Sequence, residues 1–202
     1  RERRQLGAKG EQEFAGRGVS YCAVCDGAFF RNRKLLVVGG GDSAVEEALF
    51  LTQFASEVVI VHRRDELRAQ KIIQDRAFAN PKISFLWDSV VTEIKGNKMS
   101  MTGAVIENVR TKEIHEEEAG GIFIYVGLDP LTEAFKDTGI TNEDGWIITD
   151  TQMRTSVPGV YAVGDVREKE LRQVTTAVGD GSIAGQQVFQ FIEEQKDPKT
   201  TV

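Results

Sequence analysis

The chain has few residues that bind soft metal ions. Of its 202 residues, two are cysteine and two are histidine. A structural zinc site needs a complete ligand set at short spacings, and neither His62 nor His115 stands at such a spacing from Cys22 and Cys25. We therefore expect no metal site.

Long apolar runs are also missing. No segment approaches the roughly 18 consecutive apolar residues of a membrane-spanning helix, and the first residues lack the apolar stretch of a signal peptide. The net charge of −6 disfavours nucleic acid and anionic membranes as partners. These absences favour a cytoplasmic, reducing compartment, where a disulfide is more often catalytic than structural.

The two cysteines stand three positions apart in the stretch SYCAVCDGAFF, residues 20–30. A structural disulfide between Cys22 and Cys25 would close almost no loop, so it would stabilise the fold very little. Two inert buried thiols are the plain alternative, although Asp26 and Gly27 are unusual in a buried strand. We favour a redox pair that opens a helical turn, because a helix N-terminus lowers the pKa of a thiol below its usual value of about 8.5.

The next segment has the pattern strand, glycine turn, helix, strand. Residues 35–38 form a short apolar run ended by three glycines, and apolar residues then recur at helical spacing over 44–54. Gly39, Gly41 and Ala44 fit the dinucleotide-binding fingerprint: the first makes the turn, the second lets the backbone approach a pyrophosphate, and the third permits close packing. The pyrophosphate would lie at the helix N-terminus. A simple tight turn is the alternative.

The end of the second strand indicates which dinucleotide is bound. An NAD site places Asp or Glu here for the ribose hydroxyls, but this chain has His62, Arg63 and Arg64, followed by Arg68. Guanidinium groups match a 2′-phosphate in geometry and charge, whereas a carboxylate would repel it. We therefore predict NADPH. A solvated basic turn is the alternative.

The remainder is predicted to hold further strands and one amphipathic helix. These are strands starting at Ile83 and Val90, polar pieces over 97–118, a buried strand within 120–130 stopped by Gly127 and Pro130, a strand over 155–166 ending in Gly164 and Asp165, and a helix over about 181–194.

Five stretches carry a family resemblance. They are CAVCDG (22–27), GGGDSAVEEA (39–48), HRRDELRA (62–69), GIFIYVGLDP (121–130) and TSVPGVYAVGDV (155–166). In order and spacing they resemble the bacterial-type, low-molecular-weight thioredoxin reductases. The resemblance implies an α/β, Rossmann-like FAD/NAD(P)-binding three-layer fold in a two-domain pyridine nucleotide-disulfide oxidoreductase. It also implies a homodimeric flavoprotein that passes electrons from NADPH through FAD to the Cys22–Cys25 disulfide and on to thioredoxin.

The resemblance also assigns individual residues. It makes Asp26 the acid that protonates a departing thiolate or reduced flavin, and a general acid must lie within hydrogen-bond reach of its target. Cys25 is expected to be the flavin-proximal sulfur because it adjoins Asp26, and Cys22 the one that attacks thioredoxin. The expected cofactor-binding residues are Gly39, Gly41, Asp42, Ser43, Ala44, His62, Arg63, Arg64 and Arg68 for NADPH and Asp165, Arg172, Gln173 and Val174 for FAD, together with Gly127 and Gly164.

One feature departs from the family pattern. The family begins with its own strand and glycine-rich turn for FAD, and we expect this chain to lack that N-terminal half of the FAD domain. We expect residues 1–6 to end the first part of a FAD domain, 7–129 to form the NADPH domain, and 130–202 to form the rest of the FAD domain, with apolar surface exposed at residues 160–163 and on the last helix. Other flavin disulfide oxidoreductases, such as peroxiredoxin-reducing or dithiol-oxidase types, and a noncatalytic NADPH-binding fragment are the alternatives.

Overall fold

The computed structural model describes residues 2–196. Two compact units make up the chain: a larger unit, Arg4–Gly127, and a smaller unit that joins the first residues to those from Leu128 onward. The chain thus crosses between units at residues 3–4 and 127–128. The domain boundaries predicted at residues 6–7 and 129–130 differ from these crossings by only a few residues.

A five-stranded parallel sheet forms the centre of the larger unit, with the strand order β2-β9-β3-β4-β5. Both faces of this sheet are covered, which is why its three central strands are almost continuous apolar runs. Leu35 and Val37 belong to the hydrophobic cluster on one face, while Leu36 and Val38 belong to the cluster on the other. The strands are β2 (Val19–Ser20), β3 (Lys34–Val38), β4 (Glu57–Val61), β5 (Ile83–Leu86) and β9 (Gly121–Ile124).

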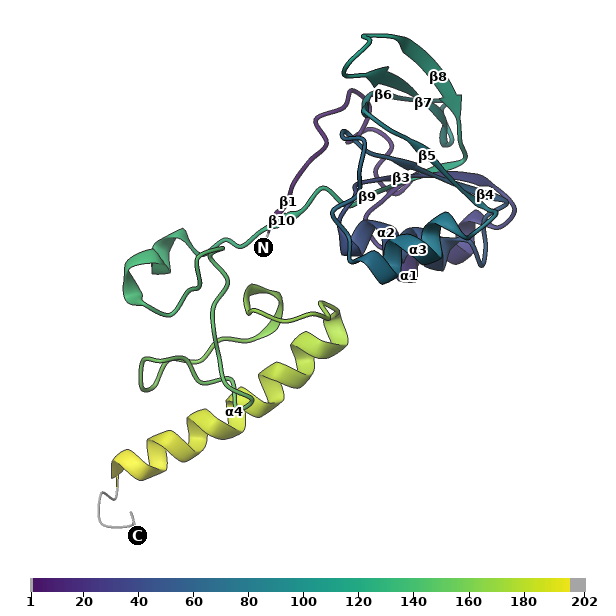
Figure 1. Ribbon diagram of the computed structural model, residues 1–202. Coiled ribbons are helices and arrows are strands. Elements are labelled where there is room, and N and C mark those ends of the chain that lie inside the picture. Colours follow the sequence, from purple (N-terminus) through teal and green to yellow (C-terminus); the bar gives the residue numbers. More distant parts are fainter. Residues whose placement is uncertain (1, 197–202) are drawn as a thin grey trace. The chain divides into compact units, whose positions relative to one another are not determined.

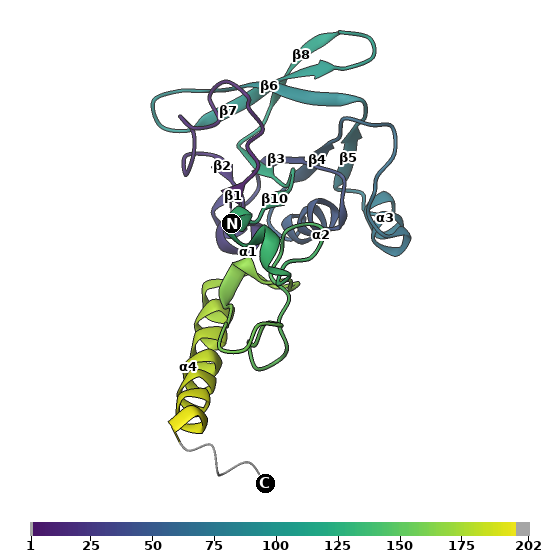
Figure 2. The ribbon, with the colours of Figure 1, turned by 90° about the vertical axis from the view of Figure 1, so that its left-hand side faces the viewer.

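Helices lie on one face of this sheet and a second sheet lies on the other (Figures 1 and 2). The helices are α1 (Ala23–Asp26), α2 (Asp42–Leu51) and α3 (Lys71–Phe78), with a short 3-10 helix, η1 (Gly27–Phe30), after α1. The second sheet is antiparallel and consists of β6 (Ser89–Gly96), β7 (Met101–Asn108) and β8 (Ile114–Glu118). The predicted α/β, Rossmann-like three-layer fold is confirmed.

Two predictions about the larger unit need correction. The helix expected over residues 44–54 covers Asp42–Leu51 instead, and an acidic first residue such as Asp42 is favourable at the positive end of a helix. The stretch expected to be polar pieces contains β7 and β8. The strand character of β8 was hidden because glutamates dominate its sequence, which an edge strand exposed to solvent tolerates.

The smaller unit has little regular structure before its final helix. Its elements are β1 (Glu2–Arg3), paired with β10 (Leu128–Asp129), the 3-10 helices η2 (Glu133–Thr138) and η3 (Gly164–Val166), and α4 (Val174–Lys196). The strand predicted over residues 155–166 is wrong: this segment makes one isolated bridge, Arg154 with Tyr161, among the described residues. A strand requires a ladder of partners, and none is present there.

Helix α4 begins several residues before the predicted residue 181. A small core of Ile140, Ile147 and Ala162 supports the smaller unit. As predicted, apolar side chains are exposed at Val160 and Val163 and along α4, among them Ile183, Val188 and Ile192.

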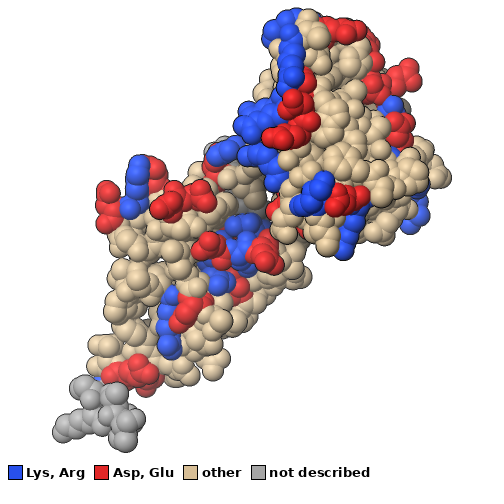
Figure 3. All heavy atoms as spheres, in the orientation of Figure 1, with Lys and Arg blue, Asp and Glu red and all other residues tan. Residues whose placement is uncertain are grey.

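Charge is mixed over the surface. On the face drawn in Figure 3, Lys and Arg side chains lie beside Asp and Glu side chains over each unit. Between residues 2 and 196, no helix is long and apolar enough to cross a membrane. The same residues contain no group of three or more His, Cys, Asp or Glu side chains arranged to hold a metal ion.

Candidate functional site

The glycine turn follows β3 and leads into α2. Gly39 has a φ of +151°, and a Cβ there would lie 2.6 Å from the backbone oxygen of Tyr125 and 2.7 Å from the Cβ of Ala44. Gly39 is therefore required by both backbone conformation and close packing. A Cβ on Gly41 would meet nothing within 4 Å, and no side chain caps the first amides of α2. The N-terminus of α2 thus offers free amide donors beside open space.

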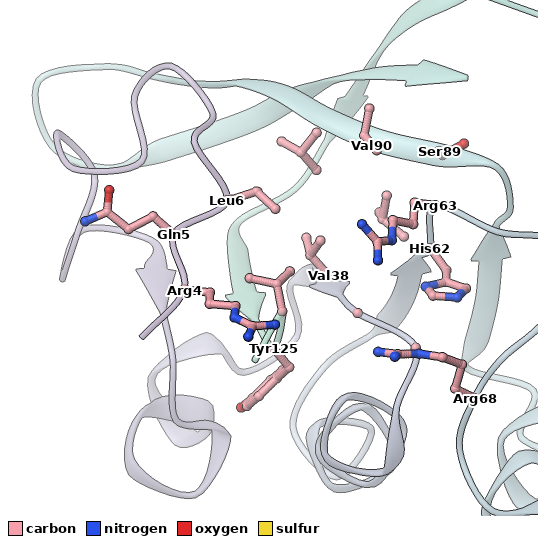
Figure 4. Close-up of a pocket in the computed structure, with 15 residues that line it drawn as sticks. Arg4, Gln5, Leu6, Val38, His62, Arg63, Arg68, Ser89, Val90 and Tyr125 are labelled. Carbon is pink, nitrogen blue, oxygen red and sulfur yellow. The ribbon is translucent and has the colours of Figure 1, made fainter. Parts of the chain in front are cut away.

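A cavity of about 350 Å³ lies at the carboxyl ends of β3, β4 and β9. In open parallel sheets this edge is where ligands bind. The guanidinium groups of Arg4, Arg63 and Arg68 point into it (Figure 4). The cavity is lined by Arg4, Gln5, Leu6, Val38, Gly39, Gly40, Val61, His62, Arg63, Arg68, Ser89, Val90, Val91, Tyr125 and Val126.

The predicted arginine cluster divides into two parts. Arg63 and Arg68 line the cavity, whereas Arg64 does not. All three are exposed, and the structure gives none of their guanidinium groups a hydrogen bond or ion pair with another described residue. Arg63 and Arg68 are therefore available to an anionic ligand in the cavity.

His62 has a packing role in the same loop. Its side chain is only 5% exposed, and a Cβ on Gly40 would lie 2.3 Å from its ring. Burial lowers the pKa of His62, and the positive charge of Arg68 lowers it further. The ring is thus neutral near pH 7 and fills the space that glycine leaves at position 40.

Several contacts hold the arginine loop in place. The backbone N–H of Arg68 donates to the carbonyl oxygen of Gly40 over 2.7 Å. At the other side of the loop, Arg110 bonds Asp65 at 2.5 Å and Asp88 at 2.9 Å. Asp42, predicted to contact the cofactor, accepts a 2.7 Å hydrogen bond from the backbone N–H of Gln70.

The two cysteines form a disulfide at the start of α1, with their Cα atoms 5.3 Å apart. Cys22 is the N-cap of α1, and its Sγ accepts a hydrogen bond from the backbone N–H of Cys25 at 3.2 Å. The predicted helical turn opened by the pair is confirmed. Cys25 is exposed, and so are its neighbours Val24 and Phe29.

Two hydroxyl groups that the sequence analysis missed hold this redox turn. The Ser20 hydroxyl donates to Oδ2 of Asp26 at 2.6 Å and accepts the backbone N–H of Cys22 at 3.2 Å. The Tyr125 hydroxyl accepts the backbone N–H of Ala23 at 2.8 Å. A serine two residues before a helix N-cap and a tyrosine in an otherwise apolar strand run are signals that could have revealed them.

The remaining predicted residues lie elsewhere. Gly127 closes the larger unit, where its carbonyl accepts the backbone N–H of Arg4 at 3.2 Å. In the smaller unit, the Arg172 guanidinium lies 4.2 Å from the centroid of the Trp146 ring. Asp165 is in η3, Gln173 precedes α4, and Val174 begins it.

Asp180 organises the segment around Gly164. It accepts the Gly164 N–H at 2.9 Å and pairs with Arg167 and Lys169, each at 2.8 Å. Burial alone would raise the pKa of Asp180, but the hydrogen bonds from Lys169 and Arg167 outweigh burial and bring the pKa below its ordinary value.

The larger unit thus holds a glycine turn, a basic cavity and a Cys-x-x-Cys disulfide. The chain belongs to the pyridine nucleotide-disulphide oxidoreductase family, whose sequence model matches residues 1–181.

Within this family, the chain is similar to thioredoxin reductases. The thioredoxin reductase of Listeria monocytogenes is 57% identical over 196 residues, which are 97% of this chain and 61% of the relative. That of Bacillus subtilis is 53% identical over 201 residues, covering all of this chain and 64% of the relative. The crystal structure of the thioredoxin reductase from Streptococcus pyogenes matches with a TM-score of 0.89 and 62% identity over 96% of this chain and 63% of the other. The resemblance to thioredoxin reductases is confirmed, and the chain spans 61–64% of the length of these relatives.

Proposed function

We propose that this chain carries the NADPH site and the redox disulfide of a thioredoxin-disulfide reductase. The observation that supports this most directly is the position of Tyr125. This residue lines the arginine-rich cavity, and its hydroxyl holds the first amide of the helix that carries the disulfide. A nucleotide pocket and a redox turn are therefore joined by one side chain within one compact unit.

NADPH fits the residues around the cavity. The uncapped amides and positive end of α2 suit a pyrophosphate, and the open space at Gly41 lets it approach the backbone. Arg63 and Arg68 would bind the 2′-phosphate, with Arg64 contributing less because it does not line the cavity. Ser43 and Ala44 belong to the same helix start, where Ala44 is buried against the turn.

FAD, when bound, supplies the two-electron carrier between NADPH and the disulfide. In the part of the chain that the structure describes, residues 39–41 are the one glycine turn that follows a strand and opens a helix with this fingerprint, so we assign that turn to NADPH. Gly164, Asp165, Arg172, Gln173 and Val174 would hold part of FAD. Val174 is 81% exposed at the first position of α4, which leaves this helix end accessible to a ring system.

The redox turn would accept the electrons. In the net reaction, NADPH and one proton would reduce the Cys22–Cys25 disulfide to two thiols, and NADPH would become NADP⁺. Asp26 would exchange the proton at Oδ1, because Ser20 already occupies Oδ2. Cys25 adjoins this acid, whereas Cys22 would attack the disulfide of the substrate.

A protein substrate suits the surroundings of the disulfide. Val24 lies between the two cysteines and Phe29 follows them, and both apolar side chains are exposed. Such side chains are typical of a protein contact surface. Thioredoxin as partner, a homodimeric assembly and a cytoplasmic location follow from the family resemblance and belong to the same proposal.

Two measurements test this function. In a protein that also carries the first part of the FAD domain, NADPH should reduce oxidised thioredoxin, and Cys25→Ser should abolish that reaction. The chain should also bind NADPH more tightly than NADH, and replacing Arg63 and Arg68 with alanine should cost NADPH at least about tenfold in affinity while NADH changes little. Thioredoxin reduction by the Cys25→Ser variant, or equal losses for both nucleotides, would contradict the assignments.

A further inference from the structure

The carboxylate of Asp42 joins two segments that are far apart in sequence. Asp42 is the first residue of α2, and Gln70 is the N-cap of α3. Oδ1 of Asp42 accepts the backbone N–H of Gln70 at 2.7 Å, and Oδ2 lies 3.4 Å from Nε2 of the same residue. Beside this contact, the backbone N–H groups of Arg68 and Ala69 donate to the carbonyl oxygen of Gly40 at 2.7 and 3.2 Å.

These bonds fasten the end of the arginine loop to the glycine turn. Arg68 lines the cavity and stands two residues before Gln70. Its guanidinium group points into the cavity in Figure 4. The position of that guanidinium therefore depends on a loop whose end is held by Asp42.

Asp42 is poorly suited to contact the nucleotide itself. A negative charge in the first turn of α2 opposes the binding of an anionic pyrophosphate at the same helix end. Its side chain is also not among those that line the cavity. A carboxylate at this place is explained by the hydrogen bond that it accepts from Gln70.

We propose that Asp42 is a positioning residue that sets the preference for NADPH over NADH. This inference rests on the proposed NADPH site. Asp42 orders the loop of Arg68 when the chain folds. Binding of the 2′-phosphate therefore does not carry the conformational entropy cost of ordering that loop. NADH lacks this phosphate and gains nothing from the ordered arginine.

Three variants separate this role from others. Asp42→Ala removes the acceptor. Asp42→Asn keeps an acceptor oxygen for the Gln70 N–H but removes the charge. Gln70→Ala is the matched control, because it keeps the backbone donor and deletes only the long 3.4 Å contact.

The experiment titrates each variant of the whole chain with NADPH and NADH and compares the two dissociation constants. Asp42→Ala should lower the NADPH preference about fivefold, the size expected for loss of one hydrogen bond, through weaker NADPH binding. Asp42→Asn should keep the preference while both nucleotides bind somewhat more tightly, and Gln70→Ala should match the parent. In Asp42→Ala, the further change Arg68→Ala should cost less than it does in the parent.

Hydrogen exchange provides a readout that does not depend on nucleotide choice. The Gln70 amide should be protected in the parent and in Asp42→Asn, and should lose protection in Asp42→Ala. Equal losses of NADPH and NADH affinity in Asp42→Ala, or undiminished protection of that amide, would overturn the positioning role. The parent could show no preference for NADPH while Asp42→Ala still removes the protection of the Gln70 amide. That pair of results would overturn both the proposed cofactor and the selectivity role, and would leave Asp42 with a structural contact only.

Discussion

Replacing Gly39 and Gly41 separately with alanine should separate folding from nucleotide binding. At Gly39 the new Cβ would lie 2.6 Å from a backbone oxygen and 2.7 Å from the Cβ of Ala44. Neither group can swing aside, since Ala44 is buried in α2 and the oxygen belongs to Tyr125 next to β9. The residue must also keep a φ of +151°, which L side chains rarely adopt.

The magnitude follows from these two terms. Overpacking a well-packed site typically costs about 1–3 kcal/mol, and a backbone conformation suited only to glycine costs about another 1–3 kcal/mol. We expect Gly39→Ala to lower the free energy of unfolding of the larger unit by roughly 2–6 kcal/mol, a large part of the about 5–15 kcal/mol that a domain has. Gly41 has a φ of −92° and no neighbour within 4 Å, but it is the N-cap of α2. The gain of about 0.4–1 kcal/mol that alanine gives at a compatible backbone position is offset there by the N-cap preference for glycine over alanine, so the free energy of unfolding should change little.

The Gly41→Ala substitution should weaken nucleotide binding rather than folding. Its added methyl group would occupy the open space beside α2 in which we place the pyrophosphate, and NADPH affinity should fall by at least about tenfold. Urea unfolding followed by fluorescence of Trp87, in a Trp146→Phe background, reports on the larger unit. A Gly39→Ala protein as stable as its parent, or a Gly41→Ala protein with unchanged NADPH affinity, would refute the reasoning.

Three further predictions concern pH and buried hydrogen bonds. The pKa of His62 is lowered in the folded state, so as the pH falls through the ordinary value of 6.5 the unfolded chain binds more protons than the folded chain and is favoured. The urea midpoint should therefore decrease when the pH is lowered from about 7.5 to about 5.5, and it should decrease less in His62→Asn. The pKa of Asp180 is lowered from its ordinary 3.8, so its contribution is present above that pH and is lost as the pH falls through the folded value; Asp180→Asn should destabilise the smaller unit at pH 7, by a margin that shrinks in acid. Tyr125→Phe leaves the buried N–H of Ala23 without its acceptor and should cost about 1–3 kcal/mol, measured as a lower urea midpoint and faster exchange of that amide; an unchanged exchange rate would contradict it.

The sequence predicted the centre of the larger unit because the signals there are local. Residues 35–38 are apolar on both faces, and the glycines that end them mark the turn without reference to any other part of the chain. The strand expected over residues 155–166 failed because pairing is not local: the apolar pattern was present but a ladder of partners was not.

The same distinction applies to the site. The Cys-x-x-Cys pair and the arginines were visible as motifs, but Ser20, Tyr125 and the packing of Gly40 on His62 depend on contacts between distant segments. Asp42 shows the limit most clearly. Its place in the fingerprint predicts a cofactor contact, whereas its hydrogen bond with Gln70 joins two segments whose proximity the sequence does not show.

The glutamates of β8 have a consequence for whether this strand can pair edge to edge with the same strand of a second copy. β8 is an edge strand with the sequence IHEEE, and its unpaired backbone groups would accept another strand. Glu116 and Glu118 are exposed along it, Glu116 in an ion pair with Lys95, while Glu117 is held by Lys34 at 2.6 Å. A second copy of this edge would bring like charges together, so the low strand propensity of glutamate is offset by protection against aggregation. The opposite edge needs no such charges, because the backbone of Lys9 bonds to Thr92 and Ile94 of β6 and covers it.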